Sequence, residues 1–258
     1  MARFFLTIEY NGTDYVGWQR QNSGLSVQQL VEEAVKSFSG LEIPIFGAGR
    51  TDSGVHAIGQ VAHLDLPDKF ESYKIILAIN AHLRKTKIKV ISATKVTPEA
   101  HARFSAIWRE YKYTILNRIS PPALNEGLVY HQKHKLNTKL MREASQILIG
   151  THDFTSFRSS HCQSKNPIKT IDTISIEKND DEIVFTIRAR SFLHHQVRNI
   201  VGSLQLVGLK KWNEENLIVA LDKKDRKAAG PTAPACGLVF NYVKYPNEIF
   251  LEENYRNL

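Results

Sequence analysis

Apolar positions recur at two different spacings along the chain, and each spacing predicts a kind of element. Phe4 to Tyr10 is rich in β-branched and aromatic side chains, which favours a strand. Ser26 and Gln29 have the spacing of a capping box, and Gly40 follows the next apolar run. Between them a helix is predicted from Val27 to Phe38, because its apolar residues form one stripe: Val27, Leu30, Val31, Ala34, Val35 and Phe38.

The same patterns extend over the remainder of the chain. Further helices are predicted from Ser72 into His82, over Thr138 to Ile149, and from about His194 to Val207. Further strands are predicted at Ile43 to Phe46, Gly59 to Leu66, Ile88 to Val96, Tyr111 to Leu116, Ile171 to Glu177 and Ile183 to Arg190. Asn179, Asp180 and Asp181 lie between the last two strands and indicate a hairpin turn.

Strands and helices therefore alternate twice, with a rough recurrence between the two halves. This order predicts a mixed α/β or α+β fold of two domains, residues 1–105 and residues 106–258, with the boundary near Arg103 to Trp108. Two such units joined by little linker favour a cleft between them, which is a usual place for a ligand.

A glycine-rich segment carries the strongest candidate for chemistry: Gly-Ala-Gly-Arg-Thr-Asp-Ser-Gly-Val-His-Ala, from Gly47 to Ala57. Its glycines disfavour a helix and allow a polymeric substrate to approach closely. Arg50 and Asp52 are two residues apart, so in extended backbone their side chains project to the same side. There the guanidinium can keep the carboxylate ionised and aimed, which a catalytic aspartate needs. Asp52 is therefore the predicted catalytic residue and Arg50 its partner.

Composition adds a preferred partner and a compartment. Lys and Arg number 34 against 26 Asp and Glu, which gives a net charge of +8 and favours polyanions, nucleic acid first. Cys162 and Cys236 are too few for a disulfide framework or a zinc site, so a reducing compartment is expected. Glu9 closely follows the first apolar residues, unlike a signal sequence, and no apolar run is long enough to cross a membrane. A cytoplasmic location is expected.

Several short segments accompany the glycine-rich one, in order, over almost the whole chain: Ile8 to Gly12, Gly17 to Gln21, His101 to Ala106, Tyr111 to Tyr113, Asp153 to Arg158, Phe192 to Leu204 and Gly237-Leu238. Together with Arg50 to Ala57, which matches the signature Arg-Thr-Asp-x-Gly-Val-His-Ala, they resemble the TruA family of tRNA pseudouridine synthases. Ser53 departs from the family pattern, which more often has alanine there.

The resemblance implies a fold and an activity. It implies two ferredoxin-like, RRM-like α/β domains that merge through a largely antiparallel sheet with a central cleft. It also implies a homodimer that converts uridine to pseudouridine at positions 38, 39 and 40 of the tRNA anticodon stem-loop, without a cofactor or a metal. Asp52 would start cleavage of the C1′–N1 bond, either by attacking carbon or by removing a sugar proton. Tyr111 would stack on the target base, and Leu238 would pack near it.

Cationic and imidazole side chains are candidates for RNA contacts. His194, His195 and Arg198 are expected on one face at the start of a helix, where backbone amides also favour anions. The resemblance raises the same expectation for Arg20, and Arg103 lies on a loop-like segment. Such contacts would give affinity without base specificity.

Other interpretations remain open at the level of sequence. A metal-dependent nucleic-acid hydrolase could use Asp52, His56 and His63 as ligands, although these histidines lack the companions of a zinc motif. A non-catalytic RNA-binding module would explain the charge and the aromatic residues, but not the pairing of Arg50 with Asp52. For Tyr113 and Leu238, ordinary core packing competes with a functional role.

Overall fold

The computed structural model describes residues 1–251, which form two compact units. Unit 1 comprises Met1–Ile107 together with the described residues from Phe240 onward, and unit 2 comprises Trp108–Val239. The division by sequence at 105/106 assigns the last segment of the chain to the second domain. In the structure that segment groups with unit 1, because its aromatic rings pack there: Tyr245 lies 4.9 Å from Phe5, centroid to centroid.

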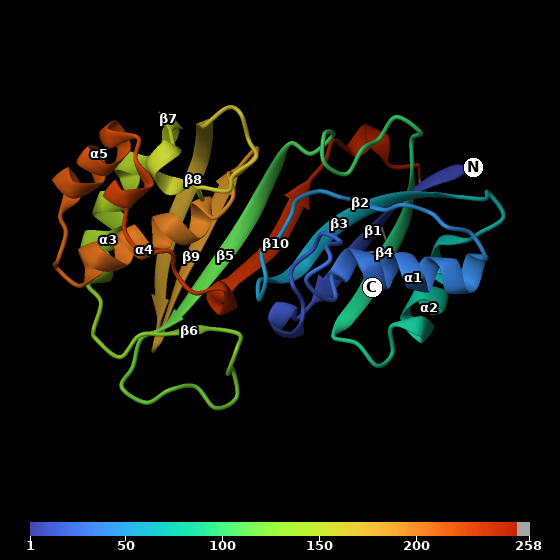
Figure 1. The fold of residues 1–258 in the computed structure, drawn as a ribbon, viewed down its shortest axis with the longest axis horizontal. Helices are drawn as coiled ribbons and strands as arrows, with labels where there is room; N and C mark the ends of the chain where they lie inside the picture. Colours follow the sequence, from blue (N-terminus) through green and yellow to red (C-terminus); the bar gives the residue numbers. More distant parts are fainter. Residues whose placement is uncertain (252–258) are drawn as a thin grey trace. The chain divides into compact units, whose positions relative to one another are not determined.

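Unit 1 has the strand order β4-β1-β3, with β2 on the other edge of β3 and helices α1 and α2 on one face of the sheet (Figure 1). This is the strand and helix arrangement of a ferredoxin-like plait. Its elements are β1 (Ala2–Tyr10), α1 (Val27–Ser39), β2 (Phe46–Gly47), β3 (His56–Leu66), α2 (Ser72–His82) and β4 (Ile88–Val96). The core on the helix side is apolar; Phe4, Leu6 and Ile8 of β1 are at most 1% exposed.

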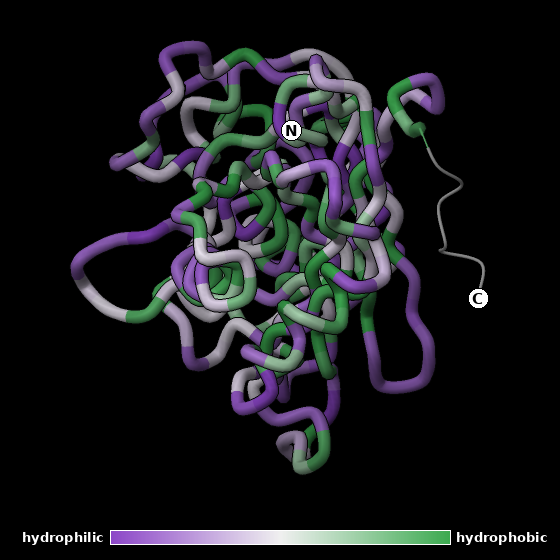
Figure 2. Tube along the Cα trace, turned by 90° about the vertical axis from the view of Figure 1, so that its right-hand side faces the viewer, coloured by the Kyte–Doolittle hydropathy of each residue, from purple (hydrophilic) through white to green (hydrophobic). Residues whose placement is uncertain are grey.

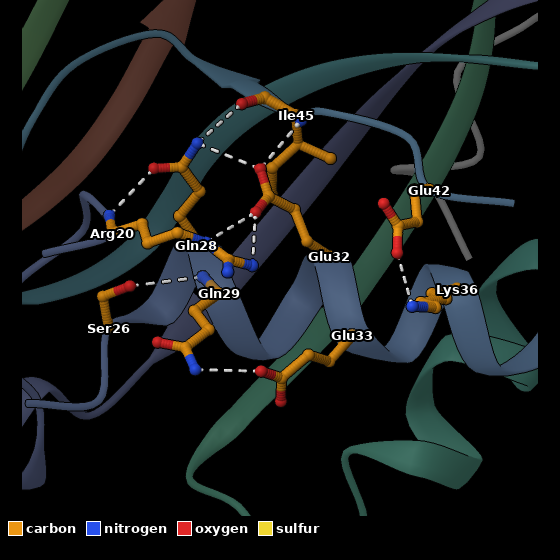
Figure 3. Close-up of polar contacts among 9 residues, drawn as sticks. All are labelled: Arg20, Ser26, Gln28, Gln29, Glu32, Glu33, Lys36, Glu42 and Ile45. Carbon is orange, nitrogen blue, oxygen red and sulfur yellow. Dashed lines mark hydrogen bonds and ion pairs between the residues drawn. The ribbon is translucent and has the colours of Figure 1, made fainter. Parts of the chain in front are cut away.

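Helix α1 begins as predicted, with one difference in its cap. The Ser26 hydroxyl accepts a hydrogen bond from the Gln29 amide at 3.2 Å, and Gly40 ends the helix with φ of 74°. The Gln29 side chain does not bond back to Ser26; it donates to Glu33 at 2.9 Å (Figure 3). The capping box is therefore half formed, because Glu33, one turn along, offers a charged acceptor.

The strand predicted at Ile43 to Phe46 is wrong in extent, since only Phe46 and Gly47 pair with β3. Pro44 has no N–H to give to a ladder. Ile45 uses its backbone toward α1 instead: its N–H donates to Glu32 at 3.2 Å, and its carbonyl accepts from Gln28 at 3.1 Å (Figure 3). Side chains of a helix have replaced a neighbouring strand as hydrogen-bond partners.

Unit 2 has the strand order β5-β9-β8-β7, with β6 parallel to the end of β5. Its strands are β5 (Trp108–Leu116), β6 (Tyr130–His131), β7 (Gly150–Asp153), β8 (Ile168–Asn179) and β9 (Glu182–Ala189), and its helices are α3 (Thr138–Ser145), α4 (Gln196–Gly208) and α5 (Glu214–Lys223). The predicted hairpin is confirmed: Asn179 pairs with Glu182, and Asp180 adopts a φ of 50° in the turn. Strand β10 (Leu238–Lys244) starts in unit 2 and continues into unit 1.

Two predicted helices have different limits. The helix predicted over Thr138 to Ile149 ends at Ser145 and tightens into a 3₁₀ turn, Gln146–Leu148. The helix predicted from His194 begins at Gln196, because His195 adopts a left-handed φ of 66° and serves as the residue before the first turn. Four elements were not predicted: β6, β7, α5 and β10.

The α+β class is confirmed by the five helices and ten strands of the described residues. The pairings of β1 with β3 and β4, β2 with β3, β9 with β5 and β8, and β7 with β8 are antiparallel, whereas β6 pairs parallel with β5. Figure 2 shows that the projecting loops are mostly hydrophilic, whereas hydrophobic stretches run through the interior. Among the described residues, no helix combines the length and apolar character needed to cross a bilayer. The merging of the two domains and the cleft between them stay predictions.

Candidate active site

The segment that contains Asp52 is a loop fixed at both ends to β3. After β2, the Ala48 amide donates to the Val61 carbonyl at 2.7 Å, and the Gln60 side chain donates to the Gly49 carbonyl at 2.8 Å. The loop then closes in a turn, where the Val55 amide donates to the Asp52 carbonyl at 3.1 Å. Asp52 thus lies at the start of a tight turn with a fixed backbone.

A second segment, Tyr10 to Trp18, is joined to the loop by hydrogen bonds. The hydroxyls of Tyr10 and Thr51 are 2.8 Å apart, and the Trp18 amide donates to the Thr51 carbonyl at 3.1 Å. The Ser53 hydroxyl donates to the Tyr15 carbonyl at 3.2 Å. Burial raises the pKa of Tyr10, so its hydroxyl stays protonated and can donate to Thr51. We call residues 10–18 the cradle of the Asp52 loop.

Two glycines of the cradle are required by this close approach. A Cβ on Gly17 would lie 2.5 Å from the Thr51 carbonyl oxygen, and Gly17 has a φ of 112°. A Cβ on Gly12 would lie 2.0 Å from the Val55 carbonyl oxygen. The motifs at Ile8 to Gly12, Gly17 to Gln21 and Arg50 to Ala57 are therefore parts of one substructure of unit 1.

The Asp52 side chain is half-buried, and Arg50 is exposed. The segment is not helical, as predicted. A half-buried carboxylate on a rigid turn can act as a base or a nucleophile, because the surrounding backbone holds it in one place while one side stays accessible. The pairing of Arg50 with Asp52 stays a prediction.

The two histidines of the metal-site alternative are used to hold backbone. The Nδ1 atom of His56 accepts from the Gly12 amide at 2.9 Å, and that of His63 accepts from the Ala102 amide at 3.2 Å. The His63 ring also stacks on Phe46 at 5.0 Å, and burial lowers the pKa of His63 to about 4. Neither ring offers its Nδ1 atom to a metal, so this geometry favours structural roles.

Two RNA-contact candidates of unit 1 lie at the surface in defined surroundings. Arg20 is held by an ion pair, its Nη2 atom 2.9 Å from Glu32, and its amide donates to Gln28 at 3.0 Å (Figure 3). The Arg103 guanidinium lies 5.5 Å from the centre of the Phe104 ring, which is 70% exposed. Both can present positive charge to a ligand.

In unit 2, Tyr111 and Tyr113 differ although both lie on β5. Tyr113 is fully buried, and its hydroxyl donates to the Pro234 carbonyl at 2.8 Å, so Tyr113 is a core residue. Tyr111 is 8% exposed, and its ring meets the edge of Phe192 at 5.1 Å. Leu238 is 5% exposed and follows Gly237, where a Cβ would lie 2.7 Å from the Tyr113 ring.

The expectation that His194, His195 and Arg198 share a helix face is wrong for the two histidines, which precede α4. Their rings lie 4.1 Å apart, centroid to centroid, and the His194 carbonyl accepts from the Ser159 amide at 2.8 Å. Arg198 lies in the first turn of α4 and donates from Nε to the Ala233 carbonyl at 2.7 Å. No local pattern in the sequence predicted the cradle of unit 1 or, in unit 2, the contact of Arg198 with the Ala233 carbonyl.

Comparison with known proteins gives consistent matches. The family model described as tRNA pseudouridine synthase matches residues 6–105 and 144–246. The tRNA pseudouridine synthase A of Rhodospirillum rubrum is 51% identical over 248 residues, 96% of this chain and 89% of that protein. The proteins of the same name from Rhodospirillum centenum and Sinorhizobium fredii are 48% and 49% identical; each match covers 95% of this chain and 100% of the relative.

Proposed function

This chain belongs to the tRNA pseudouridine synthase family and isomerises uridine to pseudouridine in tRNA, and we propose that its targets are uridines 38, 39 and 40 of the anticodon stem-loop, with Asp52 as the catalytic residue. The observation that carries this assignment is the half-buried Asp52, held on a rigid turn by the cradle. Such support keeps one carboxylate aligned while different uridines are brought to it.

The reaction breaks one bond and forms another on the same ribose. The C1′–N1 bond of the uridine is cleaved, the uracil turns, and its C5 atom bonds to C1′. The hydrogen on C5 leaves as a proton and N1 gains one, so the nucleoside keeps its composition and no redox agent is needed. Asp52 either attacks the ribose carbon or removes a ribose proton to form a glycal, and in both cases it must be ionised. Arg50 favours that charged form.

Other side chains bind the substrate around this step. Tyr111 stacks on the extruded base, and Leu238 contacts the uracil with its apolar side chain. Positive groups hold the phosphates of the stem-loop, and the candidates are Arg20, Arg103, His194, His195 and Arg198. The proposed enzyme works in the cytoplasm as a homodimer, without cofactor or metal.

The direct test follows the hydrogen on C5. Purified protein with tRNA that carries tritium at C5 of uridine is expected to release the label to water, with EDTA present and nothing else added. The modified position is identified with three tRNAs, in each of which only one of positions 38, 39 and 40 is a uridine. A metal-dependent hydrolase would cut the chain and stop with EDTA, and a binding module would release nothing. Label retained on all such tRNAs would refute the proposal.

A further inference from the structure

Two buried side chains on adjacent strands of unit 1 reach the Asp52 loop. Tyr10 ends β1 and Gln60 lies on β3, which pairs with β1 in antiparallel fashion. Tyr10 is 2% exposed and Gln60 is fully buried. The hydroxyls of Tyr10 and Thr51 lie 2.8 Å apart, and the Gln60 Nε2 atom donates to the Gly49 carbonyl at 2.8 Å. Two alternate residues of the loop, 49 and 51, are thus held by side chains of the sheet.

The burial of the loop residues follows these two contacts. Thr51 is 8% exposed, whereas Arg50 before it is exposed and Asp52 after it is half-buried. Residues 50–52 lie in no helix, and neighbouring side chains of such a segment leave the chain on different sides. A Thr51 side chain that is held inside the protein therefore directs the side chain of Asp52 outward.

The contact with Thr51 is shielded from water. Burial raises the pKa of Tyr10, and hydrogen bonds to Thr51 and Gln60 oppose that rise without cancelling it, so the hydroxyl stays protonated at neutral pH. A shift of Thr51 would leave a buried hydroxyl without its partner, which is unfavourable. The Thr51 carbonyl is held as well, because it accepts from the Trp18 amide at 3.1 Å.

The residue directly before Asp52 is therefore fixed through its side chain and through its backbone. Resting on the catalytic role proposed above for Asp52, we infer that Tyr10 is a positioning residue: by holding the Thr51 hydroxyl it sets the direction in which the Asp52 carboxylate projects. Gln60 has the same part at Gly49. The other contacts of the cradle use backbone groups, whereas this one depends on a hydroxyl that a substitution removes without changing the shape of the side chain.

The test is a double-mutant cycle on the full-length protein with Tyr10→Phe, Thr51→Val and the double variant. Each single variant should lower the rate of tritium release, measured with enzyme in excess over tRNA, about tenfold and leave the dissociation constant for tRNA within about twofold. Each should also lower the midpoint of thermal unfolding by about 2–4 °C. In the double variant both partners are apolar, so the midpoint should return to within about 2 °C of the unmodified protein, while the rate stays about tenfold low.

Thr51→Ser tests rescue, because it keeps the hydroxyl; the rate should stay within about threefold of the unmodified protein. Gln60→Met keeps the length of the side chain but removes the donor to the Gly49 carbonyl, so the rate should fall about fivefold.

The matched control is Ser92→Ala. It removes another buried hydroxyl contact of the same sheet, the bond from Ser92 to the Thr7 hydroxyl at 2.8 Å. This variant should lower the unfolding midpoint by about 2–4 °C, as the single variants do. Its rate of tritium release should stay within about 1.5-fold of the unmodified protein.

Recovery of the rate in the double variant, together with its stability, would overturn the inference, because the hydrogen bond would then serve the fold alone. An unchanged rate in Tyr10→Phe and Thr51→Val, a Thr51→Ser variant as slow as Thr51→Val, or an equal loss of rate in Ser92→Ala would also overturn it. Failure of the proposed function is seen separately: the unmodified protein would release no tritium, or Asp52→Asn would keep its turnover.

Discussion

Asp52 is half-buried, and its carbonyl accepts a hydrogen bond from the Val55 amide within a turn whose neighbour Thr51 is held by Trp18. Asp52→Asn keeps the shape of the side chain but makes it a poor base and a poor nucleophile. Tritium release should fall by at least about a thousandfold, while the dissociation constant for tRNA stays within about twofold. Turnover close to that of the unmodified protein would exclude Asp52 as the catalyst.

The neighbouring Ser53 supplies the control for this variant. Ser53→Ala removes one hydrogen bond to the Tyr15 carbonyl and introduces the residue that the family more often has. It should leave turnover within about threefold, because a single exchange of a partly exposed hydrogen bond changes little. An equal loss in both variants would show that any change in this turn disables the enzyme.

The two tyrosines of β5 separate a functional role from a structural one. Tyr113→Phe removes the hydrogen bond from the buried Tyr113 to the Pro234 carbonyl, so the free energy of unfolding should fall by about 0.5–1.5 kcal/mol. Tyr111→Leu keeps apolar bulk but loses the ring, so turnover should fall about a hundredfold with tRNA affinity within about threefold. Thermal unfolding and tritium release are measured on both. Normal turnover in Tyr111→Leu would assign Tyr111 to the core.

Candidate reactive side chains can be named from the sequence, whereas the contacts that support them cannot. Asp52 and Arg50 were expected from a spacing of two residues in a glycine-rich segment, and the segment is indeed a non-helical loop. The contact of Tyr10 with Thr51 joins residues 41 positions apart, and neither side chain is unusual for its own element. Asn199 is equally inconspicuous in the sequence, although its buried side chain donates to the Phe157 carbonyl, 42 positions away.

At the scale of elements, the cradle makes a prediction through Gly17. Gly17→Ala places a methyl group 2.5 Å from the Thr51 carbonyl at a φ of 112°, so the loop must shift. We expect a loss of about 1–3 kcal/mol in the free energy of unfolding, together with a fall in turnover of at least about tenfold.

Gly40→Ala is the matched control, since Gly40 also has a positive φ, 74°, but a Cβ there meets no atom within 4 Å. It should cost about 1 kcal/mol at the end of α1 and leave turnover unchanged. Both variants are compared by denaturant unfolding and by tritium release. A normal rate in Gly17→Ala would show that the cradle does not position Asp52.

The aromatic group around His63 predicts how stability depends on pH. Burial holds the pKa of His63 at about 4, against 6.5 for an exposed histidine, so between these values the unfolded chain binds a proton that the folded chain does not. The free energy of unfolding should therefore fall by up to about 3 kcal/mol as pH decreases from 6.5 to 4. His63→Gln should flatten this dependence, leaving the smaller contribution of His101, whose pKa burial also lowers. An unchanged pH dependence would contradict the assignment.

Elements with a strong apolar period were predicted well, and those that depend on distant partners were not. Helix α1 follows its stripe and its caps. The strand expected at Ile43 to Phe46 is short, because Gln28 and Glu32 of α1 take the backbone groups of Ile45. The first turn of α4 starts two residues late, because His195 adopts a left-handed conformation that no local pattern signals.

At the scale of the whole molecule, the recurrence of strand and helix in both halves predicted the α+β class, which the structure shows in two compact units. The return of the chain to unit 1 was not predicted, because β10 has the length and composition of an ordinary strand, and its place depends on contacts such as that of Asn241 with Gly59. A Cβ on Gly59 would lie 2.4 Å from the Asn241 carbonyl oxygen, so the close approach of these two segments requires glycine at position 59. Its partner Asn241 is 182 positions away in the sequence, so no local pattern reveals this contact.

The net charge of +8 predicts that the affinity of the protein for tRNA depends strongly on salt concentration. Each phosphate contacted by a positive side chain releases bound counterions, so the logarithm of the affinity for tRNA should fall linearly with the logarithm of the salt concentration. If all five proposed contacts reach phosphates, a slope of about −3.5 to −4.5 is expected. Arg20→Gln should reduce the magnitude of this slope by about 0.7 to 0.9, because it removes one contact with a phosphate. The exposed Arg20 can exchange its partner Glu32 for that phosphate.

Lys74→Gln is the matched control. Lys74 is a surface lysine that is likewise paired with an acid, Glu71, but it is no contact candidate, so the variant should leave the slope unchanged. Filter-binding titrations between about 50 mM and 200 mM salt measure all three proteins. An affinity that does not change over this range would contradict a broad basic contact with tRNA, and equal slopes in the Arg20 and Lys74 variants would remove Arg20 from it.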